Sequence, residues 1–236
     1  DRLTPTTPNA PRTDWCFIPS ASLGGDAFGY RWLGPDEDAL AVYLLDVCGH
    51  GMASALLSIS VLNSLQRDGL LGADFRDPGQ VLSALNDAFP ASRHNGLFFT
   101  IWYGVYEPKT RTLRFASAGH PPAVLVQQQP HPSAAPGPQI DELCTPGPMI
   151  GIIPGLHYKT QSIQLSGPAN LFVFSDGVYE LSAPSGEVLD YDAFLSHLTQ
   201  NLSAPPHNLA RMIDFARAVR GGQPLEDDFS MLELVL

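Results

Sequence analysis

The sequence is short of basic residues and of cysteine, and each shortage excludes some functions. Its 236 residues contain 13 Lys and Arg against 24 Asp and Glu, a formal net charge of −11 at pH 7. Such a chain lacks the positive surface that binds nucleic acid or an anionic membrane. The three cysteines, Cys16, Cys48 and Cys144, include no C-x-x-C pair, so neither a disulfide framework nor a zinc ribbon is expected. This cysteine usage favours a reducing, cytoplasmic setting.

Long apolar runs are also missing. The runs 39–45 and 171–174 stop at Asp46 and Asp176, far short of the roughly 20 residues that span a bilayer. The N-terminus lacks the pattern of a secretory signal peptide. Residues 1–12 are rich in Thr and Pro and carry no initiator methionine, as expected of a chain cut from a longer one. We therefore expect residues 1–14 to be a linker remnant and hypothesise a domain upstream.

What the sequence does contain is enough apolar material for one large core, since 44% of its residues are hydrophobic. Residue patterns predict strands at 15–18, 39–45, 98–106, 112–116, 123–127, 158–165, 171–175 and 229–236, and helices at 52–66, 78–89, 191–202 and 207–219. The strands between 98 and 127 are expected to form an antiparallel meander, and 128–148 an irregular surface loop. Strands in runs, interrupted by paired helices, predict an α+β fold.

Two of these helices have specific sequence features. Asp77-Pro78 provides an N-cap and a proline at the first helical position, which predicts where the second helix begins. In the first helix, 52–66, helical spacing predicts one apolar, core-facing side. That side would consist of Ala55, Leu56, Ile59, Leu62 and Leu65.

Aspartates recur where strands end or glycines turn the chain, at Asp26, Asp46, Asp176 and Asp227. Each has an ordinary explanation: a turn aspartate, a solvent-facing strand end, an Asp-Gly hairpin and a solvated acidic pair with Asp228. Together they offer carboxylates from separate strand-to-loop junctions, which is what a hard cation requires, and no histidine–cysteine set competes. Oxygen ligands of this kind favour magnesium or manganese over zinc.

Five motifs then carry a family resemblance from about Trp15 to the C-terminus. They are Gly24-Gly25-Asp26, Asp46-Val47-Cys48-Gly49-His50-Gly51, Ala118-Gly119-His120-Pro121-Pro122, Ser175-Asp176-Gly177-Val178-Tyr179-Glu180 and Asp227-Asp228. In this order they resemble the metal-dependent PPM (PP2C-like) serine/threonine phosphatases of the bacterial stage II sporulation protein E and sigma-B regulator type. The resemblance implies one domain at 15–236, an α-β-β-α sandwich of two antiparallel sheets flanked by helices.

The resemblance also implies a site for two ions, Mn²⁺ or Mg²⁺. Asp46 would bridge both ions, Asp26 and the Val47 carbonyl would serve one, and Asp176 and Asp227 the other. The family pattern Asp-x-x-Ser/Thr fits Asp227 to Ser230, which leaves Asp228 as second choice. Such ions activate a water that attacks phosphorus in line, so no side-chain nucleophile is needed. Many relatives carry a second aspartate three positions after Gly-Gly-Asp, where this chain has Gly29, which puts any additional metal in doubt.

Three other residues in the motifs could in principle take part in catalysis. His50 and His120 are candidates for auxiliary general acids, although each follows a glycine in a tight turn and has a structural explanation as well. Cys48 lies beside a proposed ligand without an identified base, so we expect a small side chain packed in a turn and no catalytic role.

The implied substrate is a phosphorylated signalling protein such as an anti-sigma-factor antagonist. The implied setting is two-component-like signalling behind a receiver or other sensor domain, with regulation by docking or by homodimer formation. The motifs also allow two other interpretations. Gly24-Gly25-Asp26-Ala27-Phe28 also resembles the diguanylate cyclase signature, but Ala27 stands where that signature has glutamate. A non-catalytic module, either calcium-binding or a pseudophosphatase, would use the same carboxylates.

Overall fold

The computed structural model describes residues 11–20, 24–128, 138–200, 202 and 207–236. Ten strands run in the order β1 (Arg12–Ile18), β2 (Ala27–Leu33), β3 (Ala39–Val47), β4 (Phe99–Glu107), β5 (Thr112–Ala118), β6 (Ala123–Gln127), β7 (Gln139–Leu143), β8 (Gln161–Gln164), β9 (Ala169–Phe174) and β10 (Phe229–Val235). The helices are α1 (Met52–Gln66), α2 (Pro78–Ala88), α3 (Tyr191–Thr199) and α4 (His207–Val219), with 3₁₀ turns at Ala91–Arg93 and Asp176–Val178.

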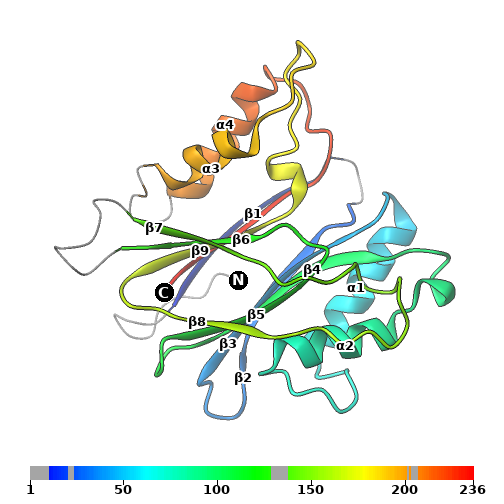
Figure 1. Ribbon diagram of the computed structural model, residues 1–236. Coiled ribbons are helices and arrows are strands. Elements are labelled where there is room, and N and C mark those ends of the chain that lie inside the picture. Colours follow the sequence, from blue (N-terminus) through cyan, green and yellow to red (C-terminus); the bar gives the residue numbers. More distant parts are fainter. Residues whose placement is uncertain (1–10, 21–23, 129–137, 201, 203–206) are drawn as a thin grey trace.

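Two five-stranded antiparallel sheets stack between two pairs of helices (Figure 1). One sheet has the order β1-β10-β9-β6-β7 and the other β2-β3-β4-β5-β8. Three buried clusters fill the three interfaces: one joins α1 and α2 to the second sheet, one lies between the sheets, and one joins α3 and α4 to the first sheet. This is the predicted α-β-β-α sandwich.

Strand β3 shows how the sequence encodes a sheet that is covered on both faces. Side chains alternate along a strand, and here both sets are apolar because both faces are buried. Leu40, Val42 and Leu44 belong to the cluster between the sheets. Tyr43, Leu45 and their neighbours in the other set pack under α1 and α2.

Most predicted elements are confirmed, and the exceptions lie at sheet edges. Edge strand β2 was missed because its residues are only partly buried and lack a clear apolar alternation. Edge strand β7 lies inside the segment that was predicted to be a loop, since its pattern is mostly exposed. Residues 129–137 of that segment lie outside the described residues.

Two further expectations about strands need correction. The meander is limited to β4 and β5, because β6 leaves for the other sheet, where it pairs with β7 and β9. Strand β1 starts at Arg12, so three residues assigned to the linker pair with β10. No helix in the described ranges is long and apolar enough to cross a membrane.

The predicted core-facing side of α1 is wrong at Leu56 and Ile59 and right at Leu65, and the bounds of the helix are as predicted. The buried side carries Ser54, Leu57, Ser58, Val61 and Leu65, whereas Met52, Leu56 and Ile59 are 69%, 58% and 54% exposed. The spacing of apolar residues gave the wrong inner face because two of the buried positions are serines. The hydroxyl of Ser54 donates to the Cys48 carbonyl (3.2 Å) and that of Ser58 to the Gly25 carbonyl, so α1 is tied to two loops.

Helix α2 begins where the sequence predicts, and its cap can be tested. The Asp77 carboxylate accepts hydrogen bonds from the backbone N–H groups of Gly79 (3.1 Å) and Gln80 (3.4 Å) and from the Thr160 hydroxyl. We expect Asp77→Ala to lower the free energy of unfolding by about 1–2 kcal/mol in chemical denaturation, since caps of this kind contribute that much. Asp87→Ala, at an exposed position of the same helix, is the control and should change it by less than about 0.5 kcal/mol. Equal effects would contradict the capping role.

Candidate metal centre

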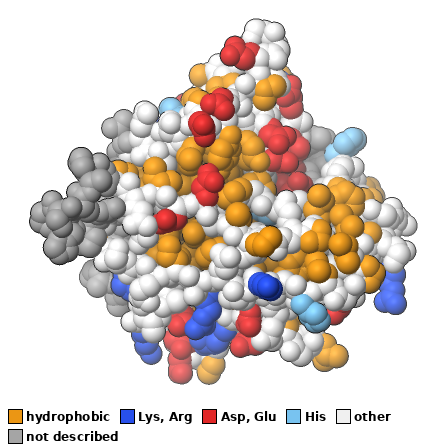
Figure 2. All heavy atoms as spheres, in the orientation of Figure 1, with side chains coloured by type: hydrophobic (Ala, Val, Ile, Leu, Met, Phe, Trp, Pro, Cys, Tyr) orange, Lys and Arg blue, Asp and Glu red, His pale blue; other side chains and the backbone are white. Residues whose placement is uncertain are grey.

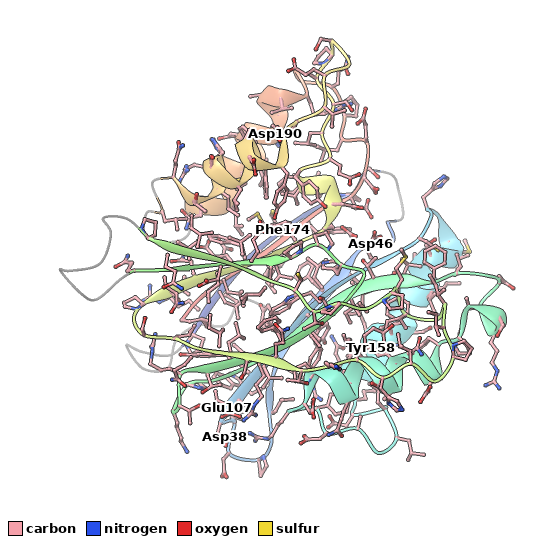
Figure 3. All side chains as sticks on the ribbon, in the orientation of Figure 1. Asp38, Asp46, Glu107, Tyr158, Phe174 and Asp190 are labelled. Carbon is pink, nitrogen blue, oxygen red and sulfur yellow. The ribbon has the colours of Figure 1, made fainter. Side chains whose placement is uncertain are left out.

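The candidate centre lies where the apolar rows between the two sheets turn polar. On β3, Asp46 continues the row of Leu40, Val42 and Leu44 and so faces the space between the sheets. Its cross-strand partner on β4 is Thr100. In the opposite sheet, Ser230 continues the row of Leu232 and Leu234 on β10, and Ser175 follows β9. In Figure 3, Asp46 is drawn below the α3–α4 layer, on the side of the view where α1 lies.

Asp26 reaches this place through a close turn before β2. A side chain on Gly25 would put its Cβ 2.5 Å from the Val47 carbonyl oxygen and 3.3 Å from Oδ1 of Asp46, so only glycine allows the approach. The turn is held by Ser58 of α1 on one side and by Asp228 on the other, whose Oδ2 accepts from the Asp26 N–H at 3.4 Å. The Oδ2 atom of Asp26 is buried and has no hydrogen-bonding partner among the described residues.

Asp176-Gly177 follows β9 as a 3₁₀ turn, and the alternative of a simple hairpin is therefore wrong. The Asp176 carbonyl accepts from the N–H groups of Tyr179 (2.9 Å) and Glu180 (2.8 Å). A Cβ on Gly177 would lie 2.3 Å from the Asp228 carbonyl oxygen. The glycine thus lets the start of β10 pass against the turn, which brings the last acidic pair next to Asp176.

A cleft of about 290 Å³ opens at this end of the sandwich. It is lined by Asp46, Thr100, Gly119, His120, Pro121, Asp176, Tyr179 and Glu180, with no Lys or Arg among them. On the face in Figure 2, acidic side chains gather beside the α3–α4 layer, and no basic side chain is visible among them. A dianionic group entering the cleft therefore needs positive charge from another source.

Burial and neighbouring charges raise the pKa of three carboxylates of the centre. Burial, then the charges of Asp176 and Asp227, raise the pKa of Asp46 from 3.8 to about 7. Burial and the charge of Asp46 raise the pKa of Asp26 well above its usual value, against smaller opposing effects of the Ser230 and Ser175 hydroxyls. Burial and the charge of Asp227 raise that of Asp176. All four predicted aspartates thus belong to one electrostatic group.

The two final acids have different surroundings. Asp228 is buried, and its Oδ1 accepts hydrogen bonds from the Ser20 N–H (2.9 Å) and hydroxyl (3.1 Å). With Oδ2 facing the Asp26 N–H, both of its oxygens are engaged in holding loops. Asp227 is exposed, and its one hydrogen bond described here comes from the Asp228 N–H at 2.7 Å. Asp227 is the acid with an oxygen to spare for a cation.

The remaining candidates are His120, which lines the cleft, and His50 and Cys48, which do not. His120 lines the cleft, with Nδ1 at 2.8 Å from the Thr100 hydroxyl, and burial lowers its pKa to about 3, so the ring is neutral. His50 is exposed on the loop before α1 and does not line the cleft. Cys48 accepts a hydrogen bond from the Phe98 N–H through its sulfur (3.3 Å), as a packed turn residue does.

Whether these residues suit a cation can be judged from their donors. Among the described residues, no three His, Cys, Asp or Glu side chains are already gathered closely enough to hold an ion. The donor set nevertheless fits a hard divalent cation, because it consists of mutually repelling carboxylates, a buried orphan oxygen on Asp26 and a nearby carbonyl at Val47. Ser175 and Ser230 belong to motifs noted in the sequence, whereas Thr100 was not predicted, since only its register opposite Asp46 places it here.

The sandwich with carboxylates at one end defines a PP2C-like fold, and solved structures share it. The PP2C domain of SiaA from Pseudomonas aeruginosa superposes with a TM-score of 0.74 at 19% identity, covering 94% of this chain and 83% of that one. The PP2C phosphatase domain of SpoIIE from Bacillus subtilis, with a fragment of its regulatory domain, gives 0.77 at 18% identity, covering 96% and 63%. RsbX in complex with magnesium gives 0.68 at 16% identity, covering 100% and 98%.

The chain belongs to the stage II sporulation protein E (SpoIIE) family, whose profile matches residues 36–235. Phosphoserine phosphatase RsbP of Bacillus subtilis is 27% identical over 174 residues, which cover 72% of this chain and 40% of the relative. Phosphoserine phosphatase RsbU of the same organism is 24% identical over 220 residues, which cover 92% and 61%. This chain therefore spans less than two thirds of the length of the curated relatives it matches.

The repulsion among the carboxylates predicts how stability depends on pH without metal. Because the folded-state pKa of Asp46 is raised from 3.8 to about 7, its stabilising protonated form is fully present below 3.8 and is lost as pH rises through about 7. Asp46→Asn keeps a neutral group at every pH. In chelator, we expect the variant to become increasingly more stable than the wild type between about pH 4 and pH 7 by thermal unfolding. A constant difference, or the same trend in exposed Asp87→Asn, would contradict the assignment.

The contrast between the two final acids gives a paired prediction. We expect Asp228→Asn to lower the free energy of unfolding in chelator by about 1–3 kcal/mol, because buried donors lose a charged acceptor. Asp227→Asn should leave that stability within about 0.5 kcal/mol and instead weaken Mn²⁺ binding in titration calorimetry. The reverse pattern would make Asp228 the ligand.

Proposed function

We propose that this chain is a metal-dependent phosphatase that removes phosphate from phosphoserine or phosphothreonine on a protein partner. The observation that carries the proposal is the convergence of Asp26, Asp46, Asp176 and Asp227, drawn from separate elements, into one electrostatic group at a cleft without basic residues. Membership of the SpoIIE family and similarity to two proteins named phosphoserine phosphatases support the same activity.

In this proposal the chain's own oxygens hold two divalent cations, Mn²⁺ or Mg²⁺. Asp46 would serve both positions, Asp26 and the Val47 carbonyl would serve one, and Asp176 and Asp227 the other. The similarity to a magnesium complex of RsbX supports a divalent ion. Such ions, when bound, activate water for in-line attack on phosphorus and neutralise the phosphoryl oxygens.

The side chains around the ions fix the shape of the cleft, and none of them acts as a nucleophile. Thr100, next to Asp46, is held by His120, whose neutral ring keeps the wall of the cleft fixed. The auxiliary acid role weighed for His120 is disfavoured, because a pKa of about 3 leaves no ring proton to give as an imidazolium near neutral pH. His50, exposed and apart from the cleft lining, remains a candidate only for substrate contact.

The proposed substrate is a phosphorylated signalling protein of the anti-sigma-factor-antagonist kind. Similarity to RsbP and RsbU supports this class of partner, and the exposed cleft mouth suits a phosphate presented on a protein surface. Control by an upstream sensor domain or by homodimer formation belongs to the same proposal. The rival is a non-catalytic member of the family, a pseudophosphatase that binds phosphoproteins without hydrolysis.

Hydrolysis of a phosphoserine peptide and of p-nitrophenyl phosphate separates the two. We expect turnover with Mn²⁺ or Mg²⁺ and none in chelator, and a fall of about 100-fold or more in kcat for Asp46→Asn and Asp176→Asn, because each removes a charged ligand. Asp87→Asn should match the wild type. A folded wild type that binds Mn²⁺ in calorimetry and turns over neither substrate would favour the pseudophosphatase.

A further inference from the structure

A buried arginine lies outside the cleft, just past the end of α4. The Arg220 side chain is 7% exposed. By comparison, Arg31, Arg76, Arg114 and Arg217, which also form ion pairs, expose 20% to 69% of their side chains. Burying a guanidinium costs solvation energy that only several well-placed acceptors can offset. The groups that accept hydrogen bonds from Arg220 therefore indicate its structural role.

Those acceptors belong to two separate stretches of chain. Nε and Nη2 donate to the Pro224 carbonyl at 3.1 and 2.8 Å, and Nη1 lies 2.8 Å from Oε1 of Glu226. Nη1 also donates to the Ser182 carbonyl at 2.6 Å. A planar guanidinium with several fixed donors can bridge both stretches at once, which an ammonium group on a flexible stem cannot do equally well.

Each stretch leads directly to a proposed ligand. Pro224 and Glu226 lie three residues and one residue before Asp227. Ser182 belongs to a small hairpin after Asp176, in which Ser182 pairs with Val188. The hairpin's position relative to Asp176 is fixed by the 3₁₀ turn between them.

A second contact joins the end of α4 to the same hairpin. A Cβ on Gly221 would lie 2.7 Å from Cγ of Pro184, so the helix end and the hairpin are packed together. The α4 terminus is thus bound to the segment after Asp176 by packing and by the Ser182 hydrogen bond. It is bound to the segment before Asp227 by three further interactions of Arg220.

We propose that Arg220 is a positioning residue that fixes Asp176 and Asp227 relative to each other, and so shapes one of the two cation positions. The inference rests on the ligand set of the proposed function. Arg220 touches neither ion nor substrate in this scheme. It acts through the backbone at Ser182 and Pro224.

The inference predicts a selective loss of metal binding. In titration calorimetry of the metal-free chain with Mn²⁺, we expect Arg220→Gln to weaken one binding step by about 10-fold to 100-fold and to leave the other within about 2-fold. Arg220→Lys should keep the fold and the charge and still weaken the same step, because one ammonium cannot bridge both stretches. The control is Arg217→Gln, on the exposed face of α4, with both steps unchanged.

The outcomes separate this inference from the proposed function. Wild-type binding of two Mn²⁺ ions with both Arg220 variants folded by circular dichroism and indistinguishable from wild type would overturn the positioning role alone. Equal weakening of both steps would also overturn it, because that indicates a general loss of structure. If Arg220→Gln does not fold, Arg220→Lys and Glu226→Gln decide in its place, and unchanged steps in both overturn the role. A wild type that binds no Mn²⁺ overturns the proposed function and this inference together.

Discussion

The repulsion among carboxylates at one end of the sandwich is the constraint on which the surrounding structure depends. Folding brings Asp26, Asp46, Asp176 and Asp227 into one electrostatic group, and burial adds to the cost of charging the first three. In water such groups would move apart, so the chain must hold them by other contacts. Much of the local sequence, including glycines at two contact points and buried serines on α1, makes sense as the means of holding them.

Those contacts fall into two halves on opposite sides of the molecule. On the α1 side, Ser54 and Ser58 hold the loop after Asp46 and the turn before Asp26. On the α4 side, the Arg220 guanidinium donates hydrogen bonds to the segments that carry Asp176 and Asp227. Each helical layer therefore supports the carboxylates of the side that it covers. Asp228 links the two halves, because it lies just before β10 and its carboxylate accepts a hydrogen bond from the Asp26 N–H.

The sequence predicts the parts of this structure that depend on local patterns. Helix bounds at Met52 and Pro78 follow from a glycine loop and an Asp-Pro cap, and the buried strands follow from apolar runs. Edge strands β2 and β7 could not be predicted, because half-exposed strands carry no strong apolar pattern. The inner face of α1 was misassigned because Ser54 and Ser58 replace apolar residues for the sake of loops that are distant in sequence. The candidate aspartates were found by motif, but the roles of Thr100 and Arg220 depend on tertiary contacts.

The apolar layer between the sheets links the two halves physically. Leu44 and Trp102 of one sheet and Val173 and Leu232 of the other belong to the same buried cluster, and each row runs to a polar residue at the centre. A shift of one sheet over the other would therefore displace Asp46 relative to Asp176 without breaking any contact within either sheet. Close packing in this layer resists such a shift, since large buried side chains such as Trp102 would have to repack. The geometry of the proposed centre is thus set by the core between the sheets as much as by the loops that carry the carboxylates.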